Sequence, residues 1–348
     1  MKAGAATGTE AETGAALEVI DGGLLTTVQD AGRPDWTHLG VPESGAADRW
    51  SLAVANLLVG NVAGAAALEM TLVGPTLVAR APVTIALAGA DLRARIRGGR
   101  RLAPGRTQRL VPGDVLEIPG DAAATPATAC RGYLAVAGGI AVPVVLGSRS
   151  TCLAGGFGGI EGRPLRTDDA ISAGAAARAG SARPPALVWP VPDDGRPERA
   201  DRHAVLRVLA VDPGGDFDAI AAREWRVGSA ADRVGIRLDG DPLPAGTGGE
   251  TTTHGVPWGA IQVPPDGRPI VLGVDHQATG GYRVVGVVIS ADLPLLGQLR
   301  PGASVRLEAT NPARAREALQ ARQADLEAGA AALRDAAGWD ALIDTAGS

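Results

Sequence analysis

A run of polar residues interrupts an apolar part of the chain. The run spans Asp275–Tyr282 and lies between the strand-like segments Ile270–Val274 and Val284–Ile289. A hydrophobic core has no need of polar groups there. Two strands joined by a Gly-Gly turn would place these groups at a strand end, where a rigid sheet can present them to a ligand. The alternative is an ordinary hairpin turn with solvated side chains. The candidate ligand-facing residues are Asp275, His276, Gln277 and Thr279.

The composition excludes several kinds of chemistry. Lys2 is the only lysine, so no biotinyl-lysine, Schiff-base lysine, phosphate-loop lysine or Ser-Ser-Lys amidase triad can reside in the folded body. The four histidines form no metal-binding pattern such as His-Glu-x-x-His, and no Gly-x-Ser-x-Gly nucleophile motif is present. An enzyme built from this chain would bind and polarise its substrate with carboxylates, amides, Arg and His, with or without another chain.

Short strands and tight turns are expected to position these residues. Hydrophobic residues make up 45% of the 348 residues and aromatic residues only 3%, while 49 Gly and 25 Pro are spread without a period. This pattern favours a mainly β chain whose core consists of Val, Leu, Ile and Ala. Residues 48–59 are the exception, because their apolar spacing and the following Gly60-Asn61 predict a helix.

Two loops are too distinctive to be simple connections. Gln29–Gly45 is long and rich in turn formers, and its Trp, Leu and Pro residues favour an ordered, functional loop. LGSRSTCLAGGFGGIEGR, residues 146–163, is Gly-rich but lacks the Gly-x-x-x-x-Gly-Lys order of a phosphate-binding loop. It therefore does not indicate nucleotide binding.

Weak sequence similarities between the first and second parts of the chain indicate a duplication. LEMTLVGPTL (68–77) is answered by VGIRLDGDPL (234–243), and VPGDVLEI (111–118) by RPGASVRLEA (300–309), in the same order. This favours tandem copies of one β-rich domain. The second copy is expected to fold either alone or completed by chain from the first half. The expected parts are a disordered tail (1–16), a first β-barrel domain (17–180), a linker (181–202), a second β-barrel domain (203–310) and a C-terminal helix and tail (311–348).

Charge and cysteine content narrow the class of partner. The net charge is −5 and no basic block occurs, so nucleic acid is not expected as a partner. Cys130 and Cys152 fit neither a zinc site nor a disulfide scaffold, which favours a reduced, cytoplasmic setting. No apolar run reaches the roughly 18 residues of a membrane span, so no membrane partner is expected either.

Several long runs resemble a known family. These are VQDAGRPDWTHLGVPESGAADR (28–49), ANLLVGN (55–61), RGYLAVAGGI (131–140), LGSRSTC (146–152) and GAIQVPPDGRPIVL, with ATGGY and VISADLP. They resemble the biotin-dependent carboxyltransferase-like family, also called the allophanate hydrolase subunit 2 or Kip-antagonist family, which includes the C-type subunit of 5-oxoprolinase. The resemblance covers roughly residues 17–310. It implies two tandem cyclophilin-like β-barrel domains with a few short helices.

The resemblance also implies partners and a reaction. The leading expectation is a C-type subunit that acts with an A-type partner and a B-type partner, the latter of cyclophilin fold, to open 5-oxo-L-proline to L-glutamate. In this reading the complex consumes ATP, but nothing in the sequence indicates that ATP binds this chain. The chain itself carries no covalent biotin and is inactive alone. One alternative is a regulatory protein that sequesters a kinase inhibitor. Another is a carboxyltransferase that acts on urea or a related amide with carboxybiotin from another chain.

The positions that match the family give two groups of site residues. Arg33, Ser44, Asp48 and Arg49 are suited to orient a carboxylate. Gln262, Asp275, Gln277 and Thr279 are suited to an amide such as a lactam or ureido group. No metal ligands are expected. The catalytic candidates are Asp48, Asp275 and His276, and the substrate-binding candidates are Arg33, Ser44, Arg49, Gln262, Gln277 and Thr279.

The sequence departs from the usual family pattern at three positions. His254 stands where an acid is common, His276 where Arg is common and Ala278 where Thr is common. An Arg-to-His change makes anion binding pH-dependent, because histidine titrates near neutral pH. The substrate could therefore be another amide.

Overall fold

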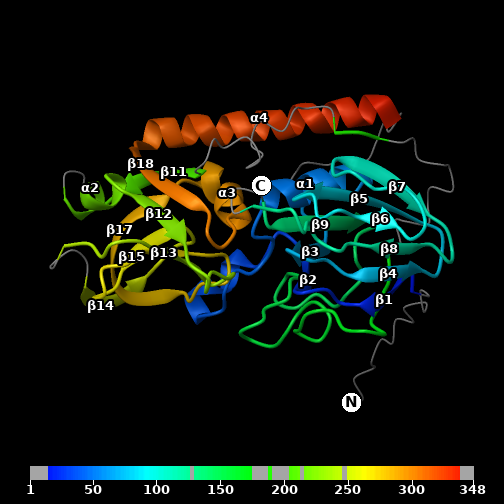
Figure 1. The fold of residues 1–348 in the computed structure, drawn as a ribbon, viewed down its shortest axis with the longest axis horizontal. Helices are drawn as coiled ribbons and strands as arrows, with labels where there is room; N and C mark the ends of the chain where they lie inside the picture. The colour runs from blue at the N-terminus through cyan, green and yellow to red at the C-terminus, as the bar shows by residue number, and fades with distance from the viewer. Residues whose placement is uncertain are drawn as a thin grey trace, which may run out of the picture.

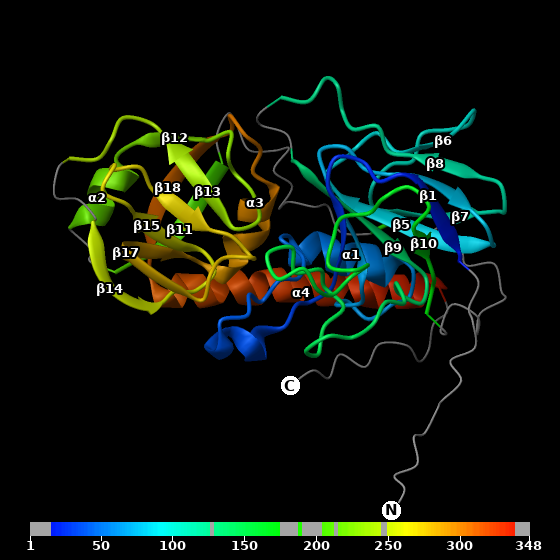
Figure 2. The same ribbon diagram turned by 90° about the horizontal axis from the view of Figure 1, so that it is seen from below.

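Two β-rich halves lie side by side, and one long helix runs along both of them (Figure 1). The computed structural model describes residues 15–125, 129–174, 187–189, 204–211, 215–244 and 249–337. The view in Figure 2 shows the same helix behind both halves. The mainly β fold predicted from composition and turn spacing is confirmed.

The first half consists of two five-stranded sheets that share one core. The first sheet has the order β10-β1-β4-β8-β6 and the second the order β2-β3-β9-β5-β7. Leu17, Leu77 and Leu116 from the first sheet pack with Leu68, Ile85 and Leu134 from the second. The strands are β1 (Leu17–Asp21), β2 (Thr26–Gln29), β3 (Ala67–Thr71), β4 (Thr76–Ala79), β5 (Val83–Gly89), β6 (Arg95–Ile96), β7 (Arg106–Leu110), β8 (Val115–Glu117), β9 (Arg131–Val136) and β10 (Ala170–Ile171).

The second half closes into a barrel. Seven strands run in the order β11-β18-β12-β13-β16-β15-β17, and pairing of β11 with β17 closes the circle, while β14 extends from the outer edge of β17. Its separate core includes Trp225, Phe217 and Ile261. The strands are β11 (Ala204–Ala210), β12 (Glu224–Val227), β13 (Gly235–Asp239), β14 (Glu250–Gly255), β15 (Ala260–Val263), β16 (Ile270–Leu272), β17 (Thr279–Val288) and β18 (Ser304–Thr310).

Three of the helices, α1 (Arg49–Leu58), α3 (Leu293–Gln298) and α4 (Pro312–Ala337), bring the two halves into contact. α1 forms where it was predicted, with Asp48 as its N-cap and Gly60 at φ 78° just beyond its end. The others are η1 (Pro34–Leu39), α2 (Asp216–Ala221) and η4 (Ser290–Asp292). α4 has 26 residues and is much longer than the others. It contacts α1 in the first half and η4 in the second.

The hairpin expected around the polar run was wrong. β15 lies between β16 and β17, so the two predicted strands are not direct neighbours. The Gly-Gly pair is part of β17 and makes no turn. A Cβ at position 280 would lie 2.3 Å from Gln262 Nε2, so a larger residue there would displace the end of the Gln262 side chain. The side chain of Gln262 fills the space that a larger residue would need.

Some predictions fall partly outside the described residues. Of the linker at 181–202 the structure describes only residues 187–189, and of the tail at 1–16 only residues 15 and 16. The proposed domain limits stay predictions. Within the described ranges, no helix combines the length and apolar character that crossing a membrane would need.

Candidate active site at the junction of the two halves

A buried network of charged side chains joins the two halves. Arg233, which precedes β13, donates from Nε and Nη2 to the two carboxylate oxygens of Asp275 at 2.6 and 3.1 Å. It also donates from Nη1 to Glu69 on β3 and from Nη2 to Gly45 O at 2.7 Å. Arg233 is 4% exposed. A guanidinium is suited to this position because its planar fork can serve several acceptors at once.

Glu69 is the acceptor from the first half. Its Oε2 accepts from Ala47 N at 2.8 Å and from Tyr133 Oη at 2.7 Å, and Arg131 lies 3.7 Å from Oε1. Burial acts to raise the pKa of Glu69, but the charges of Arg233 and Arg131 outweigh it, and the pKa is lowered. Glu69 is therefore a buried carboxylate held in its ionised form.

Asp48 is occupied by structural contacts. Its carboxylate caps α1 by accepting from Ser51 N at 2.9 Å and Ser51 Oγ at 2.6 Å, and it accepts from Gln298 Nε2 at 2.7 Å. Burial raises its pKa. Gln298 belongs to α3, so this contact also joins the halves. A catalytic role for Asp48 stays a prediction, and its observed contacts are those of a helix cap.

Asp275 and His276 follow β16 at the same junction. The His276 ring is 4% exposed, and its Nδ1 lies 2.7 Å from Gln277 O. A carbonyl oxygen can only accept, so Nδ1 carries the proton and the neutral ring keeps its lone pair on Nε2. Burial lowers the pKa of His276, against the opposing effects of Glu43 and Asp275. The geometry is that of a proton acceptor at neutral pH.

Arg33 is buried without an ionic partner. It is 2% exposed, donates from Nη2 to Ser150 O at 2.5 Å and from Nε to Val145 O at 3.4 Å, and forms no ion pair in the described parts of the chain. Phe157 lies over the guanidinium with its centroid 5.1 Å from Cζ. Nη1 has no hydrogen-bond partner there. Burial lowers the pKa of Arg33, while Cys152, Asp30 and Asp275 act to raise it.

Ser44 and Arg49 lie on either side of this buried region. The Ser44 hydroxyl is buried without a partner among the described residues, and its backbone has φ 56°. Arg49 is more open, paired with Glu43 at 3.0 Å and placed over the Trp258 ring at 5.0 Å. Because Trp258 belongs to the second half, Arg49 marks the rim of the junction. An exposed pair of this kind contributes roughly 0–1 kcal/mol.

Of the four amide-type candidates, only Asp275 belongs to the network. Gln262 on β15 is 2% exposed, and its Nε2 lies 3.5 Å from Tyr282 O. Gln277 and Thr279 are exposed where the chain enters β17. No hydrogen bond found in the described residues joins Gln262, Gln277 or Thr279 to Asp275. The structure thus brings Asp48 and Asp275 into one connected junction with His276 beside it. Gln262 and Thr279 lie on β15 and β17, and Gln277 lies in the segment before β17.

The residues that sequence reasoning missed are the partners in the network. They are Glu69, Arg131, Tyr133, Arg233 and Gln298. A signal was available for two of them: Glu69 stands between Leu68 and Met70 in an apolar strand, and Arg131 opens the apolar run of β9. Charged residues in buried strands require partners. Their partners could not be named, because Arg233 lies 164 positions from Glu69.

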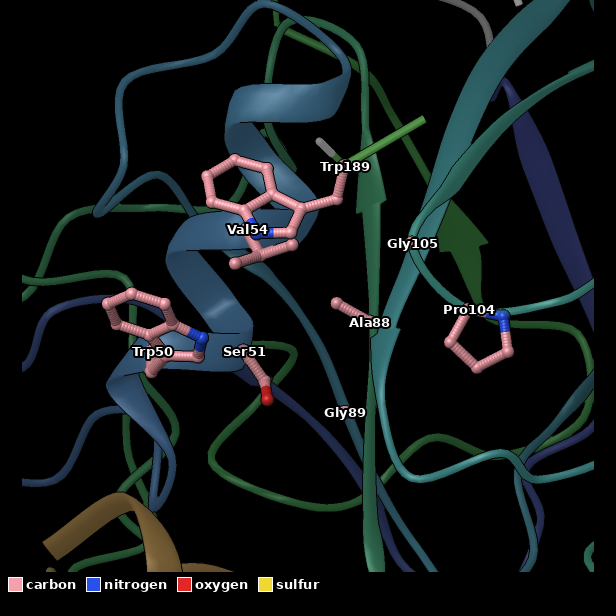
Figure 3. A pocket seen from close by; sticks show the side chains of 8 residues that line it. All are labelled: Trp50, Ser51, Val54, Ala88, Gly89, Pro104, Gly105 and Trp189. Atoms are coloured by element: carbon pink, nitrogen blue, oxygen red, sulfur yellow. The ribbon is translucent and has the colours of Figure 1, made fainter. Parts of the chain in front are cut away.

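Two small cavities adjoin α1 and the network. One of about 10 Å³ is lined by Arg131, Arg233 and Trp258, which is room for about one water. The other, of about 20 Å³, lies between α1 and β5 (Figure 3) and is lined by Trp50, Ser51, Val54, Ala88, Gly89, Pro104, Gly105 and Trp189. In the described part of the chain, no three His, Cys, Asp or Glu side chains gather as a metal site would require.

Comparison with known proteins gives concordant results. Residues 39–309 match the family model described as carboxyltransferase domain, subdomain A and B. The chain is 36% identical over 321 residues to the C-type subunit of 5-oxoprolinase from Escherichia coli, covering 88% of this chain and 94% of that protein.

Two solved structures are similar over most of the chain. The protein TTHA0988 matches with a TM-score of 0.74 and 37% identity, over 86% of this chain and 56% of that one. The urea carboxylase of Kluyveromyces lactis matches with a TM-score of 0.79 and 27% identity, over 92% of this chain and 30% of that one. The chain therefore spans little more than half of one of these proteins and less than a third of the other.

Proposed function

Since the chain belongs to the family of the carboxyltransferase domain, subdomain A and B, we propose that it is the C-type subunit of an ATP-dependent 5-oxoprolinase. In this proposal it acts with an A-type partner and a cyclophilin-fold, B-type partner to open 5-oxo-L-proline to L-glutamate. The complex consumes ATP, and this chain is inactive alone.

The observation that carries the proposal is the extent of the match. The chain corresponds to 94% of the E. coli C-type subunit, and so to a whole subunit of a multi-subunit enzyme, but to only 30% of the K. lactis urea carboxylase. Lys2 is its only lysine, so the folded body offers no attachment point for biotin.

The junction residues suggest how the chain contributes. In this proposal His276 Nε2 accepts a proton from the water whose oxygen bonds to the ring carbonyl carbon. The ring C–N bond then breaks, and the protonated His276 returns the proton to the leaving nitrogen. Asp275, fixed by Arg233, stabilises the positive charge on the ring in between. Gln262, Gln277 and Thr279 offer amide and hydroxyl groups to the ring N–H and C=O. The ATP that the complex consumes would activate the ring amide. The partner proteins supply the remaining contacts.

A second candidate is favoured by the structural comparison. The TM-score of 0.79 against urea carboxylase supports a carboxyltransferase that takes a carboxyl group from carboxybiotin on another chain and passes it to urea or a related amide. The two candidates differ in substrate and in the source of energy. ATP-dependent release of glutamate belongs only to the first.

Reconstitution tests the proposal. The chain is combined with its A-type and B-type partners, and ATP-dependent release of L-glutamate from 5-oxo-L-proline is measured with and without it. We expect activity only in the complete mixture. The matched control replaces the wild type with Arg80→Lys, which alters an exposed ion pair with Glu18 far from the junction.

Two results would reject the proposal. Glutamate release that is unchanged when the chain is omitted would show that the chain is not part of the enzyme. Transfer of carboxyl from carboxybiotin to urea, without glutamate release, would select the second candidate.

A further inference from the structure

Arg33 is a buried cation that forms no ion pair in the described part of the chain, while the carboxylates of Asp30 and Asp275 act on it from beyond ion-pair distance. A buried charge is normally paired, because removing it from water is costly. Its contacts are two backbone carbonyls and one aromatic ring, and Nη1 has no partner. An anion that is not part of these residues would complete the set.

The loop that covers Arg33 is built around one aromatic residue. Phe157 stands between two glycine pairs, 155–156 and 158–159, and Gly156, Gly158 and Gly159 all have positive φ. A Cβ at Gly158 would lie 2.1 Å from Ser150 O, the same oxygen that accepts from Arg33 Nη2. Glycine therefore lets the loop close onto the carbonyl that holds the guanidinium. Residues 154–156 are exposed and Phe157 is half-buried.

Arg33 is also tied to the junction. Its backbone N–H donates to Glu43 O at 2.7 Å, which joins the two stems of the loop that carries η1. Ser44 follows Glu43 on the opposite stem. Its hydroxyl is a second buried donor, and it has no hydrogen-bond partner among the described residues. Gly45 O then accepts from Arg233, which holds Asp275. An anion at Arg33 would lie beside the group of Asp275 and His276.

We propose that Arg33 binds the carboxylate of a small cyclic substrate, and that Phe157 covers the guanidinium until the carboxylate displaces the ring. Ser44 supplies a second donor to the anion. This inference rests on the proposed function only for the identity of the ring, because 5-oxo-L-proline carries one carboxylate. The anion displaces a cation–π contact and replaces it with charge-assisted hydrogen bonds.

Calorimetric titration of the isolated chain tests this proposal without ATP or partners. The probes are 5-oxo-L-proline, the neutral lactam 2-pyrrolidinone, cyclopentanecarboxylate and inorganic phosphate. We expect 5-oxo-L-proline to bind at least tenfold more tightly than 2-pyrrolidinone. Arg33→Lys should remove that difference, because a single ammonium cannot reproduce the guanidinium fork. Arg80→Lys, on an exposed pair, should leave it intact.

Phe157→Leu tests separately whether the Phe157 ring covers the Arg33 guanidinium. It should tighten carboxylate binding by a factor of about 2–10, because no cation–π contact has to be given up. Melting temperatures of all variants are measured first. If Arg33→Lys fails to fold, the other two variants test the proposal: Phe157→Leu should tighten carboxylate binding and Ser44→Ala should weaken it.

The outcomes separate this inference from the proposed function. Equal binding of cyclopentanecarboxylate and 5-oxo-L-proline, both lost in Arg33→Lys, would support the carboxylate site even if the lactam reaction fails. The inference is overturned if carboxylates bind no better than 2-pyrrolidinone, if Arg33→Lys binds like the wild type, or if Phe157→Leu binds more weakly. Tighter binding of phosphate than of either carboxylate would also overturn it.

Discussion

At the scale of single residues, the sequence identified the polar segments but not the contacts within them. Arg33 and Ser44 were candidates because they match motifs of the family, and Asp275 also because its polar run interrupts an apolar part of the chain; all three are buried. Arg233 was missed because an isolated Arg in a turn resembles a solvated residue. Its importance depends on two carboxylates that lie 164 and 42 positions away.

The pH dependence of stability tests the state of His276. Its pKa in the folded chain is lowered by burial below the ordinary value of 6.5. The unfolded chain then binds more protons than the folded one, so the free energy of unfolding falls as the pH drops below about 6.5. Above that pH the contribution is fully present. The hydrogen bond to Gln277 O and the charges of Glu43 and Asp275 oppose the shift of the His276 pKa without cancelling it.

His276→Gln should reduce this pH dependence by up to one proton. The measurement is urea denaturation at several values between about pH 5 and 7.5, for the wild type and the variant. The matched control is His38→Gln on the exposed helix η1, which should retain the slope of the wild type. A variant slope equal to that of the wild type would mean that His276 is not held neutral by its burial.

At the scale of elements, local sequence signals predicted a helix correctly, whereas the predicted pairing of two strands was wrong. α1 was predictable because Asp48 caps it, its apolar residues recur at helical spacing and Gly60 ends it. The expected hairpin, in contrast, is interrupted by β15. Period and turn residues specify that a segment is extended, but the choice of its neighbour depends on tertiary packing.

The long helix α4 is a packed element of the fold. Arg322 lies over the Trp50 ring at 5.3 Å, Leu333 is 2% exposed, and a Cβ at Gly329 would lie 2.4 Å from the Trp189 ring. Docking therefore reverses the usual effect of a substitution. Gly→Ala inside an exposed helix stabilises by about 1 kcal/mol, but here the added methyl would push the ring aside.

Gly329→Ala should destabilise the protein by about 1–3 kcal/mol, the usual range for overpacking. Thermal unfolding measures the effect. Ala321→Gly, at an exposed position of the same helix, is the control and should cost about 1 kcal/mol through helix propensity alone. A stabilised Gly329→Ala protein would show that α4 does not rest on Trp189 in solution.

At the scale of the whole molecule, the two halves are joined by a charged interface. The short similarities between the two parts of the sequence predict a duplication, which stays a prediction. The two halves differ in the structure: the first is a pair of five-stranded sheets and the second a closed barrel. The contacts between them pair Arg233 with Glu69 and Gln298 with Asp48, and of these four residues only Glu69 lies in a repeated segment. No local pattern encodes which charges meet across such a boundary.

A double-mutant cycle between Glu69 and Arg233 measures the strength of this connection. Removing one partner leaves the other charge buried and uncompensated, so Glu69→Gln and Arg233→Gln should each destabilise by about 3–5 kcal/mol. The double variant should lose less than the sum of the two, because the charge that each single variant leaves uncompensated is removed together with its partner. Denaturant unfolding of the four proteins gives the coupling energy.

The exposed pair Glu18–Arg80 provides the matched cycle, with its Arg Nε 2.7 Å from the carboxylate. Solvent screens that pair, so its coupling should be roughly 0–1 kcal/mol. If the halves depend on the buried network for their docking, the Arg233→Gln protein should also unfold in two transitions where the wild type shows one, since each half has its own core. Equal coupling in the two cycles would mean that apolar contacts, such as those of α4, hold the halves together without the network.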